Sequence, residues 1–245
     1  MKKLFLLGFM VFTLAPFSAQ AQQLMNFITR TTIPIVIQCP GCRGQKPDRN
    51  PVASSRTPIA QLSNRAPRAE ASGILEFRFS DARSRQNMAQ FAQKIRASDP
   101  NGADQFEQLV ASKNIMGEIG KAIAPYGLRT NDFADAYTLY WMSAWLGSRG
   151  RTDNPTRGQT AAVRNQAANA LLAAPELRAA SDAQKQEMAE ALFIQAALIS
   201  STVDSAKANP AFMAQAKAAI AQGAEGMGLD LASMTLTDNG FVPAR

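Results

Sequence analysis

The chain has 245 residues, a formal net charge of +7 and no histidine. The lack of histidine excludes Ser-His-Asp and Cys-His hydrolysis, histidine-ligated zinc and haem attachment through a Cys-x-x-Cys-His motif. The glycine-rich run at 223–228 ends a predicted helix, whereas a dinucleotide-binding loop follows a strand and opens a helix. With these motifs missing, we expect no cofactor and no metal.

The first 21 residues have the three parts of a secretion signal. Lys2 and Lys3 form a positive start, residues 4–14 form an apolar run, and small residues end at Ala21. The apolar run is too short for a membrane-spanning helix, which needs about 20 residues. We therefore expect cleavage near Ala21 and export of the remaining chain to the periplasm or beyond, without a transmembrane segment.

Residues 22–72 are basic and rich in proline, and the stretch from Arg43 to Ser72 shows no apolar periodicity, which predicts a flexible arm. Residues 22–98 hold twelve Lys and Arg against four Asp and Glu, whereas 99–245 hold twelve against fifteen. Outside the cytoplasm the arm can either bind anionic envelope components or serve as a solvated tether. Nucleic acid is disfavoured because no aromatic residues alternate with the arginines. The sequence does not identify a protein partner.

The only two cysteines lie in this arm, in the sequence Cys39-Pro-Gly-Cys42. A local disulfide between Cys39 and Cys42 is the expected state in an oxidising compartment. A redox-active pair would need a helix to start beside it, and the residues from Arg43 onward do not favour one. A zinc site would need a second cysteine pair from another chain.

The remainder, residues 73–245, predicts one all-α domain, a single helical bundle of six to seven helices joined by short connections. Short extended segments are expected near 74–79 and 234–237 in this domain, and near 33–37 in the arm. Helix starts are predicted at Ser80, Asp99, Thr130 or Asn131, 154–156, Ser181 and Asn209, where capping residues or an early proline precede apolar periodicity, and a break is expected near Asn114.

The predicted helix at 132–146 contains both tryptophans and is apolar nearly all round, which places it in the middle of its domain. Its aromatic residues are expected to dominate the core, although an aromatic ligand groove is the alternative. These residues are Phe133, Tyr137, Tyr140, Trp141 and Trp145.

Asp135 lies on the flank of this helix, where a buried carboxylate is costly unless it is paired. We expect a polar cluster of Asp135, Arg164, Glu190 and Gln195, which is either a ligand site or a buried salt-bridge network that fixes helix register. A cell-wall hydrolase that uses Asp135 with Glu190 or Glu118 is the alternative function.

Three segments resemble an uncharacterised family of exported proteobacterial helical proteins. They are Tyr126-Gly-Leu-Arg-Thr-Asn-Asp132 with the following Ala134-to-Trp145 stretch, Gln186-Glu-Met-Ala-Glu-Ala-Leu192, and the run from Gly228 to Phe241. The resemblance covers about residues 77–242; it supports the domain boundary and a helical domain, and it supplies no function. The missing catalytic motifs and the segregated charge favour an exported, non-enzymatic helical domain of the cell envelope that binds a ligand or a partner.

Overall fold

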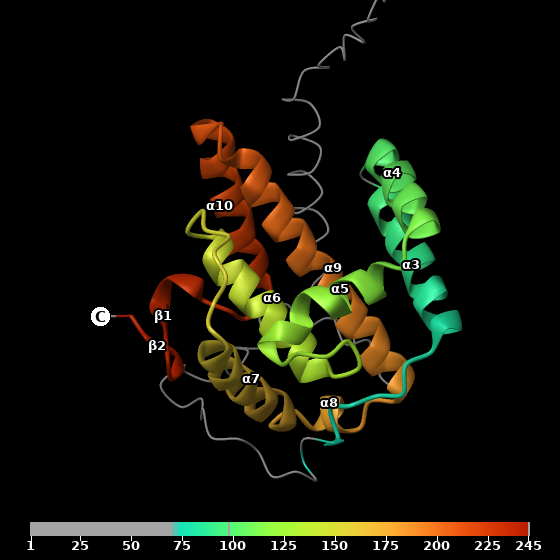
Figure 1. Cartoon of the computed structure of the whole chain (residues 1–245), viewed down its shortest axis with the longest axis horizontal. Coiled ribbons are helices and arrows are strands. Elements are labelled where there is room, and N and C mark those ends of the chain that lie inside the picture. Colours follow the sequence, from blue (N-terminus) through green and yellow to red (C-terminus); the bar gives the residue numbers. More distant parts are fainter. Residues whose placement is uncertain (1–70, 72, 98, 245) are drawn as a thin grey trace, which may run out of the picture.

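The computed structural model describes residue 71, residues 73–97 and residues 99–244. The predicted signal, the segment at 33–37, and Cys39 and Cys42 lie outside these residues. Figure 1 shows a mostly helical arrangement, as predicted. The helices are α3 (Asp81–Arg96), α4 (Pro100–Ser112), α5 (Ile115–Ile123), α6 (Phe133–Gly147), α7 (Arg157–Leu172), the single-turn α8 (Pro175–Arg178), α9 (Asp182–Ala206) and α10 (Pro210–Gly226).

Helix α6 lies at the centre of the molecule, in contact with α7, α9 and α10 (Figure 1). Most of its residues are buried, because apolar side chains surround the helix axis and neighbouring helices cover them. The largest of the buried side chains in the described part of the chain include Trp141 of α6 and Phe193 of α9. The α6–α9 contact is therefore the main core of the fold.

The capping residues account for most helix boundaries. Thr156 and Ser181 each form a capping box, with Gln159 and Gln184 respectively, at the starts of α7 and α9. The expected break is confirmed at Asn114, whose side chain caps α5. One predicted cap is wrong: Asp132, rather than Thr130 or Asn131, caps α6, because its side chain accepts hydrogen bonds from the first turn.

The extended segments are shorter than the sequence predicts. Around residues 74–79, Glu76 forms one isolated bridge with Asp132, and no named strand includes either residue. The segment at 234–237 is confirmed as β1 (Met234–Thr237), and it pairs antiparallel with β2 (Gly240–Pro243), which was not predicted. Gly240 has a φ of 85°, which helps to explain why glycine occupies this turn.

Helices α3 and α4 form a hairpin at the edge of the molecule (Figure 1). Helix α3 packs on both α4 and α9, whereas α4 packs mainly on α3. The hairpin is closed by the rings of Phe91 and Phe106, whose centroids are 5.4 Å apart. Helix α5 then leads through the 3₁₀ turn η2 (Ala124–Tyr126) to α6, so the hairpin is joined to the core at both ends.

Candidate functional site

Two carboxylates lie at the start of α6, and neither has any exposed surface. Asp132 is the N-cap, and its Oδ1 accepts hydrogen bonds from the backbone N–H groups of Ala134 at 2.8 Å and Asp135 at 3.3 Å. Asp135 is in the first turn, and its Oδ2 accepts the backbone N–H of Arg129 at 2.8 Å. Negative charge is favourable here because the helix N-terminus carries a partial positive charge.

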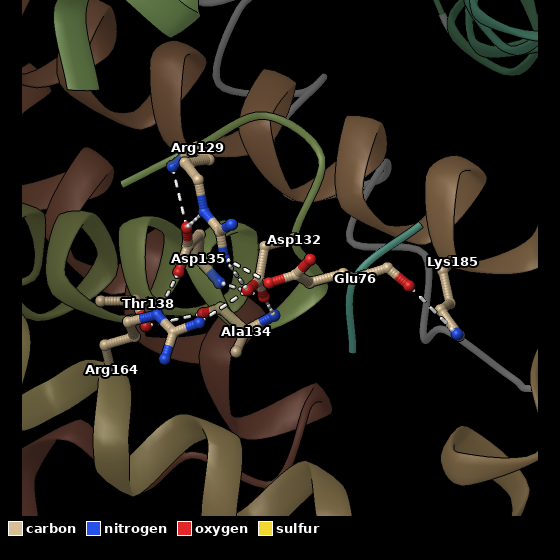
Figure 2. Close-up of polar contacts among 8 residues, drawn as sticks. All are labelled: Glu76, Arg129, Asp132, Ala134, Asp135, Thr138, Arg164 and Lys185. Carbon is tan, nitrogen blue, oxygen red and sulfur yellow. Dashed lines mark hydrogen bonds and ion pairs between the residues drawn. The ribbon is translucent and has the colours of Figure 1, made fainter. Parts of the chain in front are cut away.

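Two arginines neutralise this pair (Figure 2). Arg164 of α7 reaches both carboxylates: its Nη2 donates to Asp132 at 2.6 Å and its Nε donates to Asp135. Arg129 donates from Nη2 to Asp132 at 2.8 Å and to Glu76 at 2.9 Å. We call Glu76, Arg129, Asp132, Asp135 and Arg164 the charge network; it ties three separate stretches of chain to the start of α6.

Burial dominates the electrostatics of the charge network. Burial, reinforced by the negative charge of Asp132, raises the pKa of Asp135 from 3.8 to about 6, although Arg164 acts in the opposite direction. Burial also works to lower the pKa of Arg164, but the two carboxylates outweigh it, so this pKa is raised and the guanidinium stays charged. Because both carboxylates already bind protein donors, the network is suited to holding elements together rather than to receiving a substrate.

A second buried network joins α9 to α3. Glu190 has no exposed surface, and it accepts hydrogen bonds from the side-chain amides of Asn87 at 2.7 Å and Gln186 at 2.9 Å. Gln186 also bonds both backbone groups of Ser80, accepting from its N–H and donating to its carbonyl. Lys185 of the same turn donates to the carbonyl of Glu76 (Figure 2). This network fixes the chain just before α3 against α9.

The hairpin formed by β1 and β2, which we call the C-terminal hairpin, covers the aromatic face of α6. The indole N–H of Trp145 donates to the carbonyl of Met234, and that of Trp141 contacts the Met234 sulfur. Phe241 stacks on Trp141 with ring centroids 4.7 Å apart, and Gln166 of α7 hydrogen-bonds both the N–H and the carbonyl of Phe241. These contacts make the aromatic cluster a packing interface within the chain.

Arg149 also holds the C-terminal hairpin of β1 and β2 against α6. Its guanidinium lies 4.1 Å from the Trp145 ring centroid and donates to the carbonyls of Trp145, Leu231 and Met234. A cation is favoured here, where α6 ends, because the last carbonyls of a helix carry partial negative charge. The C-terminal hairpin is therefore held by stacked aromatic rings, by hydrogen bonds to backbone groups and by the guanidinium of Arg149.

The described surface includes a groove and a smaller cavity. A groove of about 520 Å³ lies along the α3–α4 hairpin and the start of α5, and we call it the hairpin groove. A smaller cavity of about 130 Å³ lies beside α6 and the loop at 148–156. None of Asp135, Glu190 and Glu118 lines either one. Within the described residues, no group of three metal-ligating side chains has an arrangement that could hold an ion.

A family of unknown function, DUF6683, matches residues 45–243. The chain belongs to DUF6683. The match begins upstream of residue 77, where the resemblance noted from the sequence begins, so it includes part of the predicted arm. No curated protein and no solved structure matches the chain.

The structure of this DUF6683 chain separates the four residues expected to form one polar cluster. Asp135 and Arg164 form an ion pair, whereas Glu190 belongs to the network with Asn87. The side-chain Nε2 of Gln195 is buried and has no hydrogen-bond partner in the described part of the chain. The residues expected to form one cluster therefore belong to two hydrogen-bond networks, and Gln195 belongs to neither.

Several members of these networks were not expected from the sequence, namely Glu76, Asn87, Arg129, Asp132 and Gln186. Asp132 had a usable signal, since aspartate directly before an apolar helix is a preferred N-cap. Asn87 and Gln186 had none, because nothing local distinguishes them from the solvated amides of other helices. No helix in the described part of this DUF6683 chain combines the length and hydropathy needed to cross a membrane.

Proposed function

We propose that this DUF6683 chain is an exported, non-enzymatic helical domain of the cell envelope that binds its ligand in the hairpin groove. The observation that carries the proposal is the contrast between the groove and the buried carboxylates. The groove is open and has a volume within the roughly 300–1,000 Å³ typical of ligand sites. The carboxylates that could perform acid–base chemistry are enclosed by their own partners.

The location in the envelope rests on the predicted signal at residues 1–21. The test is expression of the chain with its signal in a bacterium, followed by fractionation and N-terminal sequencing. We expect a periplasmic or secreted product that begins near Gln22. An unprocessed cytoplasmic product would contradict export and leave the binding role to be judged separately.

The basic arm supports an envelope role in a second way. Its excess of Lys and Arg favours contact with anionic surfaces, and salt should weaken that contact because dissolved ions screen electrostatic attraction. Binding of the full chain to anionic vesicles is expected to fall between 50 mM and 300 mM salt. The groove and the arm are therefore separable: changes in the groove should leave this salt-sensitive adhesion unchanged.

The alternative of a wall-active hydrolase lacks support from the geometry. Asp135 and Glu190 have no exposed surface, and Glu118 is an exposed residue bonded to Lys121 at 2.7 Å. A two-carboxylate mechanism needs both groups to face one scissile bond. Wall-clearing activity in the wild type that disappears in Glu190→Gln would overturn the non-enzymatic proposal.

The binding role is tested by thermal unfolding of the full chain in the presence of wall fragments, lipids and small metabolites. A ligand specific to the folded state stabilises it by about 2.7 kcal/mol at a hundredfold excess over Kd, which raises Tm by several degrees. We expect at least one class to give a shift that Ala89→Phe abolishes, because Ala89 lines the groove. A shift that is the same in wild type and variant would place binding elsewhere.

A further inference from the structure

Small side chains contribute to the lining of the hairpin groove on both of its helices. The rings of Phe91 and Phe106 hold α3 and α4 together. Apart from these rings, the lining includes Ala89 of α3 and Ala111 of α4, both exposed. A larger side chain at either position would occupy space in the groove.

The floor of the groove is apolar and adaptable. Its apolar lining is Phe79, Met88, Val110, Ile115 and Met116. Phe79 has 37% of its surface exposed, and among the described residues Leu109 is the one other large apolar side chain that is exposed. The two methionines have unbranched, polarizable side chains that can pack against ligands of different shape. Such a lining suits an extended aliphatic chain more than a polar sugar.

Four charged residues line the groove, two of each sign. Glu107 binds Arg96 at 2.9 Å, and Arg96 also binds Asp104 at 2.7 Å. Asp81 lies in the first turn of α3, where the helix N-terminus favours its charge. Among the described residues, Arg85 and Lys113 have no carboxylate within 4.0 Å. The groove therefore offers two cations outside any ion pair of the described residues, beside an apolar floor.

We infer that the hairpin groove binds a free fatty acid, with its acyl chain on the apolar floor and its carboxylate between Arg85 and Lys113. Arginine presents a planar pair of N–H donors that matches a carboxylate, and lysine adds a point charge. A single acyl chain fits a groove of about 520 Å³. The inference rests on the proposed function, because it names the ligand of that same groove.

The test is calorimetric titration of the full mature chain with dodecanoate and with methyl dodecanoate, each below its aggregation concentration. The ester has the same chain but no charge, so we expect it to bind at least about tenfold more weakly, the loss typical of a charge-assisted contact. Equal affinity for the two would overturn the assignment of the carboxylate to Arg85 and Lys113.

A matched pair of charge-reversal variants separates the groove from the general basic character of α3. The double variant Arg85→Glu with Lys113→Glu should weaken dodecanoate binding by about tenfold or more and abolish the preference over the ester. The control, Arg83→Glu with Lys94→Glu, makes the same change in net charge at exposed sites that do not line the groove. Equal losses in the two variants would overturn the site. Asp81→Asn should instead tighten binding.

Steric block provides a readout that does not depend on charge. Ala89→Phe and Ala111→Phe add rings inside the groove at exposed positions, so the chain should remain folded while dodecanoate binding is lost. Unchanged binding in both variants would place the fatty acid elsewhere and overturn the inference. If dodecanoate fails to bind wild type while a wall fragment or an amphipathic peptide binds and is blocked by Ala89→Phe, the inference fails and the proposed function stands. If no ligand class binds, both fail.

Discussion

At the start of α6, two carboxylates without exposed surface share two arginines, whereas along the α3–α4 hairpin large apolar side chains and two cations stay exposed. The first region satisfies its polar groups within the chain, and the second leaves them for solvent or a ligand. The comparison shows that a buried cluster of titratable residues need not be the best candidate for a binding site. In this molecule those residues connect elements.

The two regions should also differ in their tolerance of substitution. A buried ion pair is expensive to break, because the partner left behind keeps a desolvated charge. Substitutions at the exposed positions of the groove should cost the protein little stability, since surface substitutions usually change the free energy of unfolding by less than about 0.5 kcal/mol. Four substitution experiments, from the largest expected effect to the smallest, test this difference.

The largest effect is expected from Arg164→Met. The substitution removes the cation shared by Asp132 and Asp135 and leaves two adjacent buried carboxylates with Arg129 alone. The expected loss in free energy of unfolding is about 3–5 kcal/mol, measured by urea denaturation with circular dichroism. Arg157→Met is the control, because Arg157 is exposed on the same helix. A loss below about 1 kcal/mol in Arg164→Met would mean that the charge network is not a stabilising device.

The next largest effect is expected from Phe241→Ala. Phe241 is 1% exposed and stacks on Trp141, so its removal leaves a cavity between α6 and the C-terminal hairpin. The expected loss is about 3 kcal/mol. Tryptophan fluorescence gives a direct readout, because both tryptophans contact the hairpin. The half-buried neighbour Val242, changed to Ala, should cost less than about 1 kcal/mol. Similar losses at the two positions would show that the hairpin is not seated through Phe241.

The helices of this fold could be predicted from the sequence because their signals are local. The caps of α7 and α9 are set by residues three positions apart, and the apolar periodicity of α3 identifies its buried face. The hairpin of β1 and β2 was only half predicted, because β2 is held by Gln166 and the tryptophans of α6 rather than by its own pattern. For such short segments, tertiary contacts rather than the local sequence determine whether a strand forms.

The candidate site was predictable to a smaller extent. A buried carboxylate on α6 requires a partner, which predicts the pairing of Asp135 with Arg164 that the structure contains. This requirement does not distinguish between partners on distant helices. The expected cluster therefore also includes Glu190, although Glu190 accepts a hydrogen bond from Asn87. The hairpin groove had no signal, because it depends on where Ala89 and Ala111 lie relative to each other in space.

The pH dependence of stability should expose the cost of burying Asp135. Since its pKa rises from 3.8 to about 6 on folding, the folded state binds the proton more tightly, and the stability this contributes is lost as pH rises through about 6. Lowering the pH from 7.5 to 5 should therefore stabilise wild type by about 1 kcal/mol relative to Asp135→Asn. Arg129, Arg164, Asp132 and Glu76 face this carboxylate and are the same in both proteins. Parallel pH profiles for the two would contradict the raised pKa.

The smallest effect is expected in the hairpin groove, and it is measured with one substitution at two positions of α3. Ala89 is exposed and lines the groove, so Ala89→Phe adds a ring to open space and should change the free energy of unfolding by less than about 0.5 kcal/mol. Ala92, three residues later, has no exposed surface, so Ala92→Phe forces a ring into packed core and should cost about 1–3 kcal/mol. Helix propensity and composition change equally in the two variants, which leaves the space around each side chain as the difference. If Ala89→Phe costs as much as Ala92→Phe, the two helices close on each other in solution and the groove is not available to a ligand. If only Ala92→Phe is destabilising, the opening between α3 and α4 is a stable feature of the folded chain, and any loss of fatty acid binding in Ala89→Phe reflects the blocked groove rather than a damaged fold.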